Sequence, residues 1–329
     1  MNVTRREILG AAVAGMALTR CGSSKTKSAQ TRRVPALGYK SAVSIVKAPA
    51  YTTDVYDTVY RMVADHRLNV RGKRIVLKPN LVEFDPHTSI NTHPMVVHAA
   101  YEAFRRLGAA DVKIAEGPGH RRATLDLADA AGYFSTVPKF EDLFTDLNLD
   151  SVAKRLVPQP VSQLKELYLP CTVLDCDLLV SLPKMKTHHW AGATLAMKNL
   201  FGLIPGGVYG WPKNVLHWAG IPQSIVDIHH LFPRQFAIVD GIIGMEGNGP
   251  IQGTPKNSGV LVAGSDVVAV DATCCRIMGI DAKKIDYLKI ARGEDNLAES
   301  AFRQIGETVA AVRTPFELID PWRQMVRAA

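Results

Sequence analysis

The chain contains no apolar run of the length that a membrane-spanning helix needs, which is roughly 20 residues. The apolar stretch near the N-terminus, from Ile8 to Leu18, is too short to cross a bilayer. Apolar residues make up 47% of the sequence and charged residues 21%, which is an ordinary balance for a globular protein. We therefore expect a soluble globular body, long enough to bury one large core or two modest ones.

Cysteine is scarce, and the familiar cofactor motifs are missing. The chain has five cysteines, and no two of them form a C-x-x-C pair. Iron–sulfur clusters are held by closely spaced cysteines, so we expect no intrinsic iron–sulfur cluster. The sequence also lacks the G-K-[ST] end of a Walker loop and the H-E-x-x-H zinc signature. The cofactor therefore stays unknown from motifs, and a divalent metal has to be argued from other residues.

A strong basic charge of the folded body is also lacking, although the whole chain carries a net charge of +8. Residues 1–20 carry a net +2 and residues 21–33 a net +4, which leaves only +2 for everything from Val34 onward. Nucleic-acid-binding domains have a basic footprint of their own. We therefore expect no nucleic-acid partner.

The N-terminus is typical of an export signal. Arg5 and Arg6 directly precede the short apolar run, which is the arrangement of a twin-arginine signal read by an export machinery. Residues 1–20 are therefore interpreted as the signal segment, with a chance Arg-Arg pair before an amphipathic helix as the alternative. Residues 21–33 are polar, small and basic, and predict a flexible tether.

Cys21 adds a second prediction about location. Leu18-Thr19-Arg20-Cys21-Gly22 resembles a lipobox, in which the cysteine becomes lipidated, although Arg20 departs from the pattern. Cys21 is therefore either a membrane anchor or an ordinary cysteine near a cleavage site. In both cases we expect the protein to be exported, either periplasmic or anchored on the outer side of the cytoplasmic membrane.

Residues 34–329 are predicted to form one α/β domain. Short β-branched runs alternate with helical patterns, which is typical of βαβ units and a mainly parallel sheet with helices on both faces. Strands are expected at residues 42–46, 74–77, 112–115, 178–182, 236–239 and 260–263. Helices are expected at residues 54–65, 94–107, 221–231 and 267–278.

Five polar clusters follow predicted strands, at residues 78–80, 116–120, 183–188, 240–250 and 264–266. Ligands of open α/β sheets bind outside the carboxyl ends of the strands, so most of these clusters are expected to meet at one rim. The alternative is that they are ordinary polar loops of an α/β protein.

Lysines are prominent in these clusters, namely Lys78, Lys184, Lys186 and Lys198. Several ammonium groups around one cleft would hold a phosphate or carboxylate, or would lower one another's pKa toward a base or Schiff-base role. The alternative is that they are solvated surface lysines. Apolar neighbours such as Leu77 and Leu182 favour the functional interpretation.

Two further segments suggest chemistry. Asp227 and His230 lie on the helix predicted at residues 221–231, and together with His217 they are candidate ligands of a divalent metal, with a structural role as the alternative. The glycine-rich segment 241–250 is interpreted as an anion-binding loop that carries Glu246 as an acid or base, or as a loop that merely turns sharply.

The motifs taken together resemble the domain of unknown function 362 family. They are KPNLV at 78–82, PKMKTH at 183–188, ATLAMKNLFG at 193–202, IVDGIIGMEGNGP at 238–250 and AVDATCCRIMG at 269–279. The resemblance spans roughly residues 40–295. The positions that match the family's motifs are Lys78, Asn80, Lys184, Lys186, Lys198, Asn199, Asp240, Glu246, Asn248 and Asp271. It implies no settled activity. Some relatives carry ferredoxin-like segments, which implies redox company, but this chain lacks their cysteines.

The function favoured by these observations is an enzyme that acts on a small anionic substrate. Lys184, Glu246 and His188 are the expected catalytic residues. The expected ligand-binding residues are Lys78, Asn80, Lys186, Lys198, Asn199, Asp240 and Asn248. One alternative is a metal- or ligand-binding carrier without catalysis. Another is an accessory protein of an iron–sulfur redox system, docking through a patch around Trp190 and Trp211.

Overall fold

A computed structural model describes residues 41–325 of the chain. The predicted signal segment, the tether and Cys21 lie outside the described residues. Within residues 41–325, no helix is both long and apolar enough to span a membrane.

The centre of the fold is a single large sheet with the strand order β12-β1-β11-β10-β7-β2-β3-β4. All strands of this series run in one direction except β11, which is antiparallel to both of its neighbours. In chain order these strands are β1 (Ser41–Lys47), β2 (Arg74–Pro79), β3 (Asp111–Glu116), β4 (Phe144–Asp146), β7 (Leu178–Leu182), β10 (Gln235–Asn248), β11 (Gln252–Gly264) and β12 (Phe302–Gly306). The prediction of a mainly parallel sheet is confirmed.

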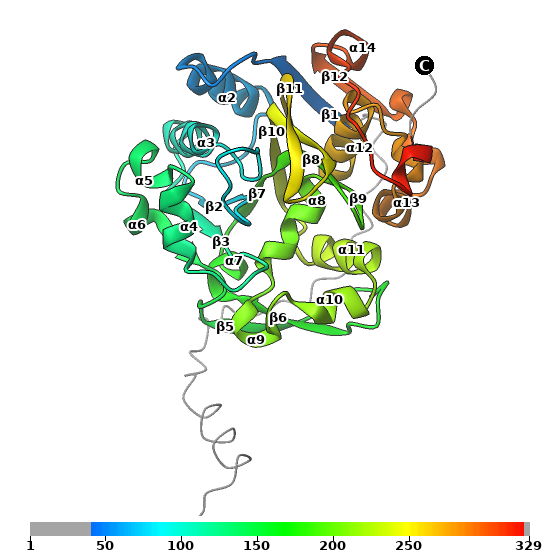
Figure 1. The fold of residues 1–329 in the computed structure, drawn as a ribbon. Helices are drawn as coiled ribbons and strands as arrows, with labels where there is room; N and C mark the ends of the chain where they lie inside the picture. Colours follow the sequence, from blue (N-terminus) through cyan, green and yellow to red (C-terminus); the bar gives the residue numbers. More distant parts are fainter. Residues whose placement is uncertain (1–40, 326–329) are drawn as a thin grey trace, which may run out of the picture.

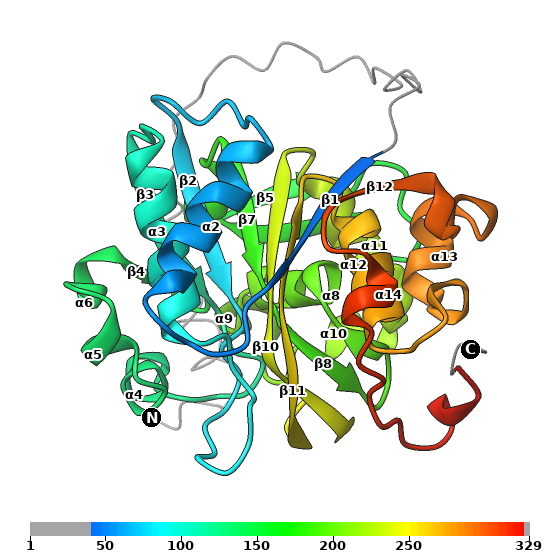
Figure 2. The ribbon, with the colours of Figure 1, turned by 90° about the horizontal axis from the view of Figure 1, so that it is seen from above.

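Helices cover both faces of this sheet, as expected. Figure 2 shows α2 (Asp54–Asp65) and α3 (Pro94–Arg106) on one side, with α11 (Ile221–Leu231), α12 (Val267–Ile277) and α13 (Asp286–Arg292) on the other. Buried apolar residues fall into two clusters, one under each layer of helices. The sheet therefore separates two hydrophobic cores.

Amphipathic spacing explains why these segments are helical. In α2 the buried residues are Val55, Val59, Met62 and Val63, which share one helix face and pack toward α3. Helix α3 begins where His93 accepts a hydrogen bond from the Met95 backbone N–H, and Pro94 occupies the first turn, where its missing N–H costs nothing.

The glycine-rich segment is a strand and not the predicted loop. β10 continues to Asn248 and pairs with β11 in a long antiparallel hairpin. The predicted loop at 183–188 is likewise largely strand β8 (Lys184–His188), which lies beside β10 and pairs with β9 (Gly192–Thr194). The glycines allow this close packing, because a Cβ at Gly244 would lie 2.6 Å from the Met185 carbonyl oxygen.

Shorter elements complete the fold around this frame (Figure 1). A two-stranded sheet is formed by β5 (Val152–Leu156) and β6 (Glu166–Pro170). The short helices are α4 (Thr124–Ala130), α5 (Tyr133–Thr136), α6 (Phe140–Leu143), α7 (Cys171–Leu174), α8 (Ala196–Asn199), α9 (Gly206–Tyr209), α10 (Asn214–Trp218) and α14 (Val309–Val312). Helices α8 and α10 matter most for function, because they border the main cavity.

Candidate functional site

Four of the five polar clusters contribute to one cavity of about 400 Å³. The carboxyl ends of β2 and β3 supply Lys78 and Glu116, and β8 supplies Lys186 and His188. The fifth cluster, at residues 264–266, does not join them, because it follows the antiparallel strand β11. There Asp266 caps α12 and forms an ion pair with Arg292.

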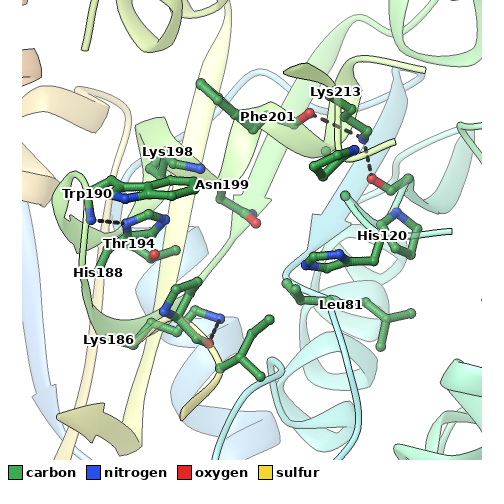
Figure 3. Close-up of a pocket in the computed structure, with 18 of the residues that line it drawn as sticks. Leu81, His120, Lys186, His188, Trp190, Thr194, Lys198, Asn199, Phe201 and Lys213 are labelled. Carbon is green, nitrogen blue, oxygen red and sulfur yellow. Dashed lines mark hydrogen bonds between the residues drawn. The ribbon is translucent and has the colours of Figure 1, made fainter. Parts of the chain in front are cut away.

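The charged side chains that line the cavity are four lysines and Glu116, which is its one carboxylate among the described residues. Figure 3 shows His188, Thr194 and Lys198 on one wall, with Leu81 and His120 on the opposite side. The lysines around it are Lys78, Lys186, Lys198 and Lys213. This imbalance makes the cavity a candidate anion site.

Lys78 and Glu116 form a buried ion pair across neighbouring strands. The distance from Lys78 Nζ to Glu116 Oε2 is 2.5 Å, and both side chains are almost completely buried. Glu116 also accepts hydrogen bonds from the backbone N–H groups of Leu81 and Gly117. Burial lowers the pKa of Lys78, and the nearby carboxylate opposes that shift.

Asn199 links the strands to helix α8. Its Oδ1 accepts hydrogen bonds from Lys78 Nζ and from Asn80 Nδ2, both at 3.1 Å. Its amide nitrogen donates to the Lys78 carbonyl oxygen and to Ser181. Asn80 is buried behind this contact and does not line the cavity, so it positions Asn199.

Lys186 is completely buried and forms no ion pair with an acidic residue among residues 41–325. Its Nζ donates to the backbone carbonyls of Ile90 at 2.9 Å and Pro250 at 3.1 Å. Burial, together with the charges of Lys184 and Lys198, holds the pKa of Lys186 well below its usual range. Two of its donor positions are thus used to tie β8 to the surrounding loops.

Lys198 lies on α8, and its amine makes no hydrogen bond or ion pair within residues 41–325. Its Nζ lies 3.9 Å from the centroid of the Phe201 ring. Burial, and then the charge of Lys78, lower the pKa of Lys198 to about 7. The turn that carries it is held by Asp271, whose two oxygens accept hydrogen bonds from the backbone N–H groups of Ala196 and Met197.

Lys213 is a functional candidate that the sequence did not reveal. Its Nζ donates to the carbonyl of Gly117 at 2.6 Å, and it has a left-handed backbone with φ of 65°. Such conformations are costly outside glycine and cluster at functional sites. Burial lowers the pKa of Lys213 to about 7, although Glu116 opposes the shift. The only signal in the sequence was the glycine- and tryptophan-rich segment before it.

His188 is poorly suited to the proton-shuttle role expected from the sequence. Its Nδ1 accepts hydrogen bonds from the backbone N–H groups of Trp190 and Ala191, so the ring proton must sit on Nε2. Burial and the charge of Lys198 hold its pKa well below the usual range. His188 therefore presents a neutral Nε2–H donor. In the neighbouring His189 the contact is reversed, since its Nδ1 donates to the Gly249 carbonyl oxygen.

Lys184 and Asp240 belong to a different network, although the sequence placed them in the same site. Lys184 Nζ lies 2.6 Å from Asp240 Oδ2 and also donates to the Tyr51 hydroxyl and the Ile243 carbonyl. Asp240 further accepts a hydrogen bond from the His93 backbone N–H. Lys184 borders a second cavity, of about 350 Å³, and not the 400 Å³ cavity. Its three donor positions are filled, which leaves it no catalytic freedom.

Glu246 also lies apart from the cavity. It pairs with Lys256 at 3.0 Å and accepts a hydrogen bond from the Glu317 backbone N–H. Asn248, two residues further on, does line the cavity and donates to Gln252. Glu246 and Asn248 lie at different positions along the extended strand β10. Their side chains therefore contact different neighbours and do not gather in one loop.

The predicted metal ligands do not form a site. Asp227 is buried, and its two oxygens accept hydrogen bonds from the backbone N–H groups of Val161 and Ser162. His217 lines the cavity, whereas His230 is exposed at the end of α11. Within residues 41–325 no three His, Cys, Asp or Glu side chains are close enough to hold a metal ion.

The two tryptophans of the predicted docking patch have different surroundings. Trp190 lines the cavity and is 59% exposed. The Trp211 ring packs against Gly206, where a Cβ would collide with it. Trp190 therefore forms part of the cavity wall, and Trp211 packs against the backbone at Gly206.

Comparison with known proteins gives a family but no reaction. The family model described as "Domain of unknown function (DUF362)" matches residues 75–276. A thylakoid-associated protein of Synechocystis sp. is 29% identical over 220 residues, which cover 65% of this chain and 65% of that protein. The chain thus spans slightly less than two thirds of that relative's length.

Two solved structures are distantly similar. The lactate racemase apoprotein of Thermoanaerobacterium thermosaccharolyticum is 14% identical, with a TM-score of 0.48, over 73% of this chain and 57% of the other. A Thermotoga maritima protein is also 14% identical, with a TM-score of 0.43, over 68% of this chain and 57% of the other. Neither resemblance bears on the chemistry of the cavity.

Proposed function

Because the chain belongs to the DUF362 family, whose description names no reaction, we propose from the cavity itself that this protein is an enzyme acting on a small anionic substrate. The observation that carries the proposal is the charge of the cavity. Four lysines border it, only one carboxylate faces them among the described residues, and that carboxylate is already paired with Lys78.

The charge imbalance has a physical consequence. Burying several ammonium groups close together raises the free energy of the protein without a ligand, or forces some of them to be neutral. An anion relieves both penalties when it binds, and it does so most strongly beside Lys198, which has no hydrogen-bond acceptor in the described part of the chain. A carboxylate or phosphate group is therefore the expected ligand.

The dimensions of the cavity limit the size of the substrate. A volume of about 400 Å³ lies in the lower part of the range for small-molecule sites. The aromatic rings of Phe201 and Trp190 line the same space and would contact the carbon skeleton of a bound molecule. We therefore expect a small organic acid or phosphate ester.

The test combines binding with turnover. Oxalate, glyoxylate, phosphate and glycerol phosphate are titrated into the protein by calorimetry at constant ionic strength. Each organic anion that binds is then followed by carbon-13 NMR during incubation. Wild-type protein is expected to bind at least one of them and to convert a bound organic anion. Lys198→Met should weaken the binding.

A matched control is Lys256→Met, which removes one positive charge outside the cavity, where Lys256 contacts Glu246. It should leave binding unchanged. Equal binding by wild type and Lys198→Met would contradict the proposal, as would the absence of binding by all four anions. Binding without conversion would overturn the enzymatic part and favour a carrier.

Export through the twin-arginine machinery is proposed on the sequence of residues 1–20 alone. Replacing Arg5 and Arg6 together by Lys should retain the precursor in the cytoplasm, because the transporter recognises the arginine pair. Cys21→Ser tests the anchor: if Cys21 is lipidated, the variant should move from the membrane fraction to the periplasmic fraction. Unchanged periplasmic yield of the double-lysine variant would refute the signal assignment.

A further inference from the structure

We propose that the side-chain amine of Lys198 forms a covalent imine with the carbonyl group of a small oxo acid bound in the 400 Å³ cavity. The inference rests on the proposed function and narrows it to one class of substrate, a carbonyl compound that also carries a carboxylate. The evidence for it is a comparison of five lysines, of which four donate hydrogen bonds and one does not.

Among the lysines of this region, Lys198 is the one whose amine makes no hydrogen bond or ion pair with residues 41–325. Lys78, Lys184, Lys186 and Lys213 all donate hydrogen bonds to carboxylates or backbone carbonyls. Lys198 Nζ lies over the face of the Phe201 ring, 3.9 Å from its centroid. A nucleophile must turn its lone pair toward the substrate, and an amine that is not held by hydrogen bonds to fixed acceptors is free to do so.

The amine is also held in place. Helix α8 begins where Asp271 accepts hydrogen bonds from two consecutive backbone N–H groups, at 2.7 and 3.0 Å. The next residue, Asn199, is fixed by its contacts with Lys78 and Ser181. Lys198 lies between these two anchors, so its backbone cannot drift away from the cavity. A fixed nucleophile reacts faster with a bound substrate.

Two polar groups on the same wall suit the carbonyl oxygen. The neutral His188 ring carries its proton on Nε2, and Thr194 Oγ1 is buried without a hydrogen-bond partner in the described chain. Figure 3 shows both beside Lys198. A hydrogen bond from His188 would stabilise the negative charge that develops on oxygen during attack. The Thr194 hydroxyl would donate a second hydrogen bond to the same oxygen and would thereby gain a partner.

The carboxylate requirement follows from the other cations. Lys78 and Lys213 border the cavity and place positive charge around it, while Glu116 offsets only part of that charge. An aldehyde or ketone without an acid group would leave these ammonium groups uncompensated. An oxo acid would supply the anion to them and the carbonyl carbon to Lys198.

The covalent step balances without an oxidant. The lone pair of Lys198 Nζ attacks the carbonyl carbon, and the π electrons of the C=O bond move to oxygen. The two amine hydrogens and the carbonyl oxygen then leave as one water molecule, and a C=N double bond remains. When protonated, that imine withdraws electrons from the neighbouring carbon, which is how such adducts promote cleavage of a bond there.

The experiment traps the imine by reduction. Full-length mature protein is incubated with glyoxylate and sodium cyanoborohydride at pH 7, and the adduct is counted by intact mass and located by peptide mapping. One adduct per chain is expected, on Lys198. Propionaldehyde, which lacks a carboxylate, should label Lys198 about tenfold more slowly, the smallest factor expected from losing one hydrogen bond to a charged group.

Variants make the result specific. Lys198→Arg keeps a cation but should lose the adduct, whereas Lys256→Met should label as wild type does. If Lys198→Arg unfolds, mapping of the wild-type adduct alone decides the matter. An adduct spread evenly over surface lysines, or concentrated on Lys186, would overturn the inference. Anion binding by calorimetry without any adduct would overturn it while leaving the proposed function standing. The absence of both anion binding and an adduct would overturn the inference and the proposed function together.

Discussion

Lys78 and Glu116 face each other across the parallel strands β2 and β3, with 2.5 Å between Nζ and Oε2, and close one side of the cavity. Gly202 makes room for the pair, because a Cβ there would collide with the Glu116 carboxylate and with Lys78. A buried pair of this kind contributes less to stability than its geometry suggests, but removing one partner leaves an unpaired charge in the interior.

Glu116→Gln should therefore lower the free energy of unfolding by about 3–5 kcal/mol. Adding Lys78→Met to it should restore part of the loss, because no uncompensated charge remains. Urea denaturation of the wild type, the two single variants and the double variant closes the cycle. A double variant that loses the full sum of the single effects would show that the two side chains do not interact.

Anion binding should depend on pH in a defined direction. The pKa values of Lys198 and Lys213 are both lowered to about 7 in the empty cavity. Below pH 7 both amines are protonated and attract an anion, and above pH 7 a proton must be taken up on binding. The affinity for oxalate should thus fall as pH rises from 7, by up to about tenfold per pH unit for each proton taken up.

Calorimetry in two buffers with different ionisation enthalpies measures the proton uptake directly. Lys198→Arg should reduce the uptake near pH 8, because arginine stays protonated. Imine formation needs the neutral amine of Lys198, so the attack itself should become faster as pH rises. Because anion binding weakens over the same range, trapping of glyoxylate should peak near pH 7. An affinity independent of pH between 6 and 9 would exclude both amines from the anion site.

The acid that holds α8 offers a separate test of how Lys198 is positioned. Asp271→Asn replaces one acceptor oxygen by an N–H₂ group that faces a backbone N–H, which should cost about 1–3 kcal/mol. The loosened turn should admit water to Lys198 and raise the pKa of its amine toward the ordinary value of about 10.4. The pH profile of Lys198 modification by an amine reagent, located by peptide mapping, reports that pKa.

Helix α12, which carries Asp271, also provides the control. Asp266 caps α12 through the Ala269 backbone N–H and pairs with Arg292, and it does not line the cavity. Asp266→Asn should also lower stability, but it should leave the modification profile of Lys198 unchanged. Equal shifts in both variants would mean that general loosening of α12, and not the hydrogen bonds from α8, sets the pKa.

The sheet and its helices could be predicted because hydrophobic periodicity reports burial directly. The apolar spacing of α2 and the largely apolar composition of β7 can be recognised without knowledge of their neighbours. The direction of β11 was not accessible in this way. Its antiparallel pairing moved Asp266 to the far end of the sheet, and a glycine-rich segment that looked like a loop became half of a hairpin.

The lysine cluster was predictable only in outline for a related reason. That Lys78, Lys186 and Lys198 would gather follows from strand ends meeting at one rim. Which amines are occupied depends on backbone carbonyls far away in sequence: Lys186 contacts Ile90, 96 residues distant, and Lys213 contacts Gly117. Residue type does not encode such contacts, so Lys213 was missed and Lys184 was overvalued.

For Lys184 and Glu246, the sequence motifs predict a role in ligand binding, whereas the structure predicts an effect on stability alone. As motif residues within the predicted cleft, both were expected to act on the ligand. The structure places Lys184 in a saturated network with Asp240 and Tyr51, and Glu246 beside Lys256. Lys184→Met should strand the buried Asp240 charge and lower the free energy of unfolding by about 3–5 kcal/mol.

Glu246→Gln should change stability by less than about 1 kcal/mol, because its ion pair with Lys256 is partly exposed. Neither variant should alter the oxalate affinity of the folded protein, since neither side chain lines the 400 Å³ cavity. Calorimetry well below the melting temperature, with the folded fraction fixed by circular dichroism, separates the two effects. A weakened affinity in Glu246→Gln without loss of fold would place the anion site at the β10–β11 hairpin, and the assignment to the Lys198 cavity would then fail.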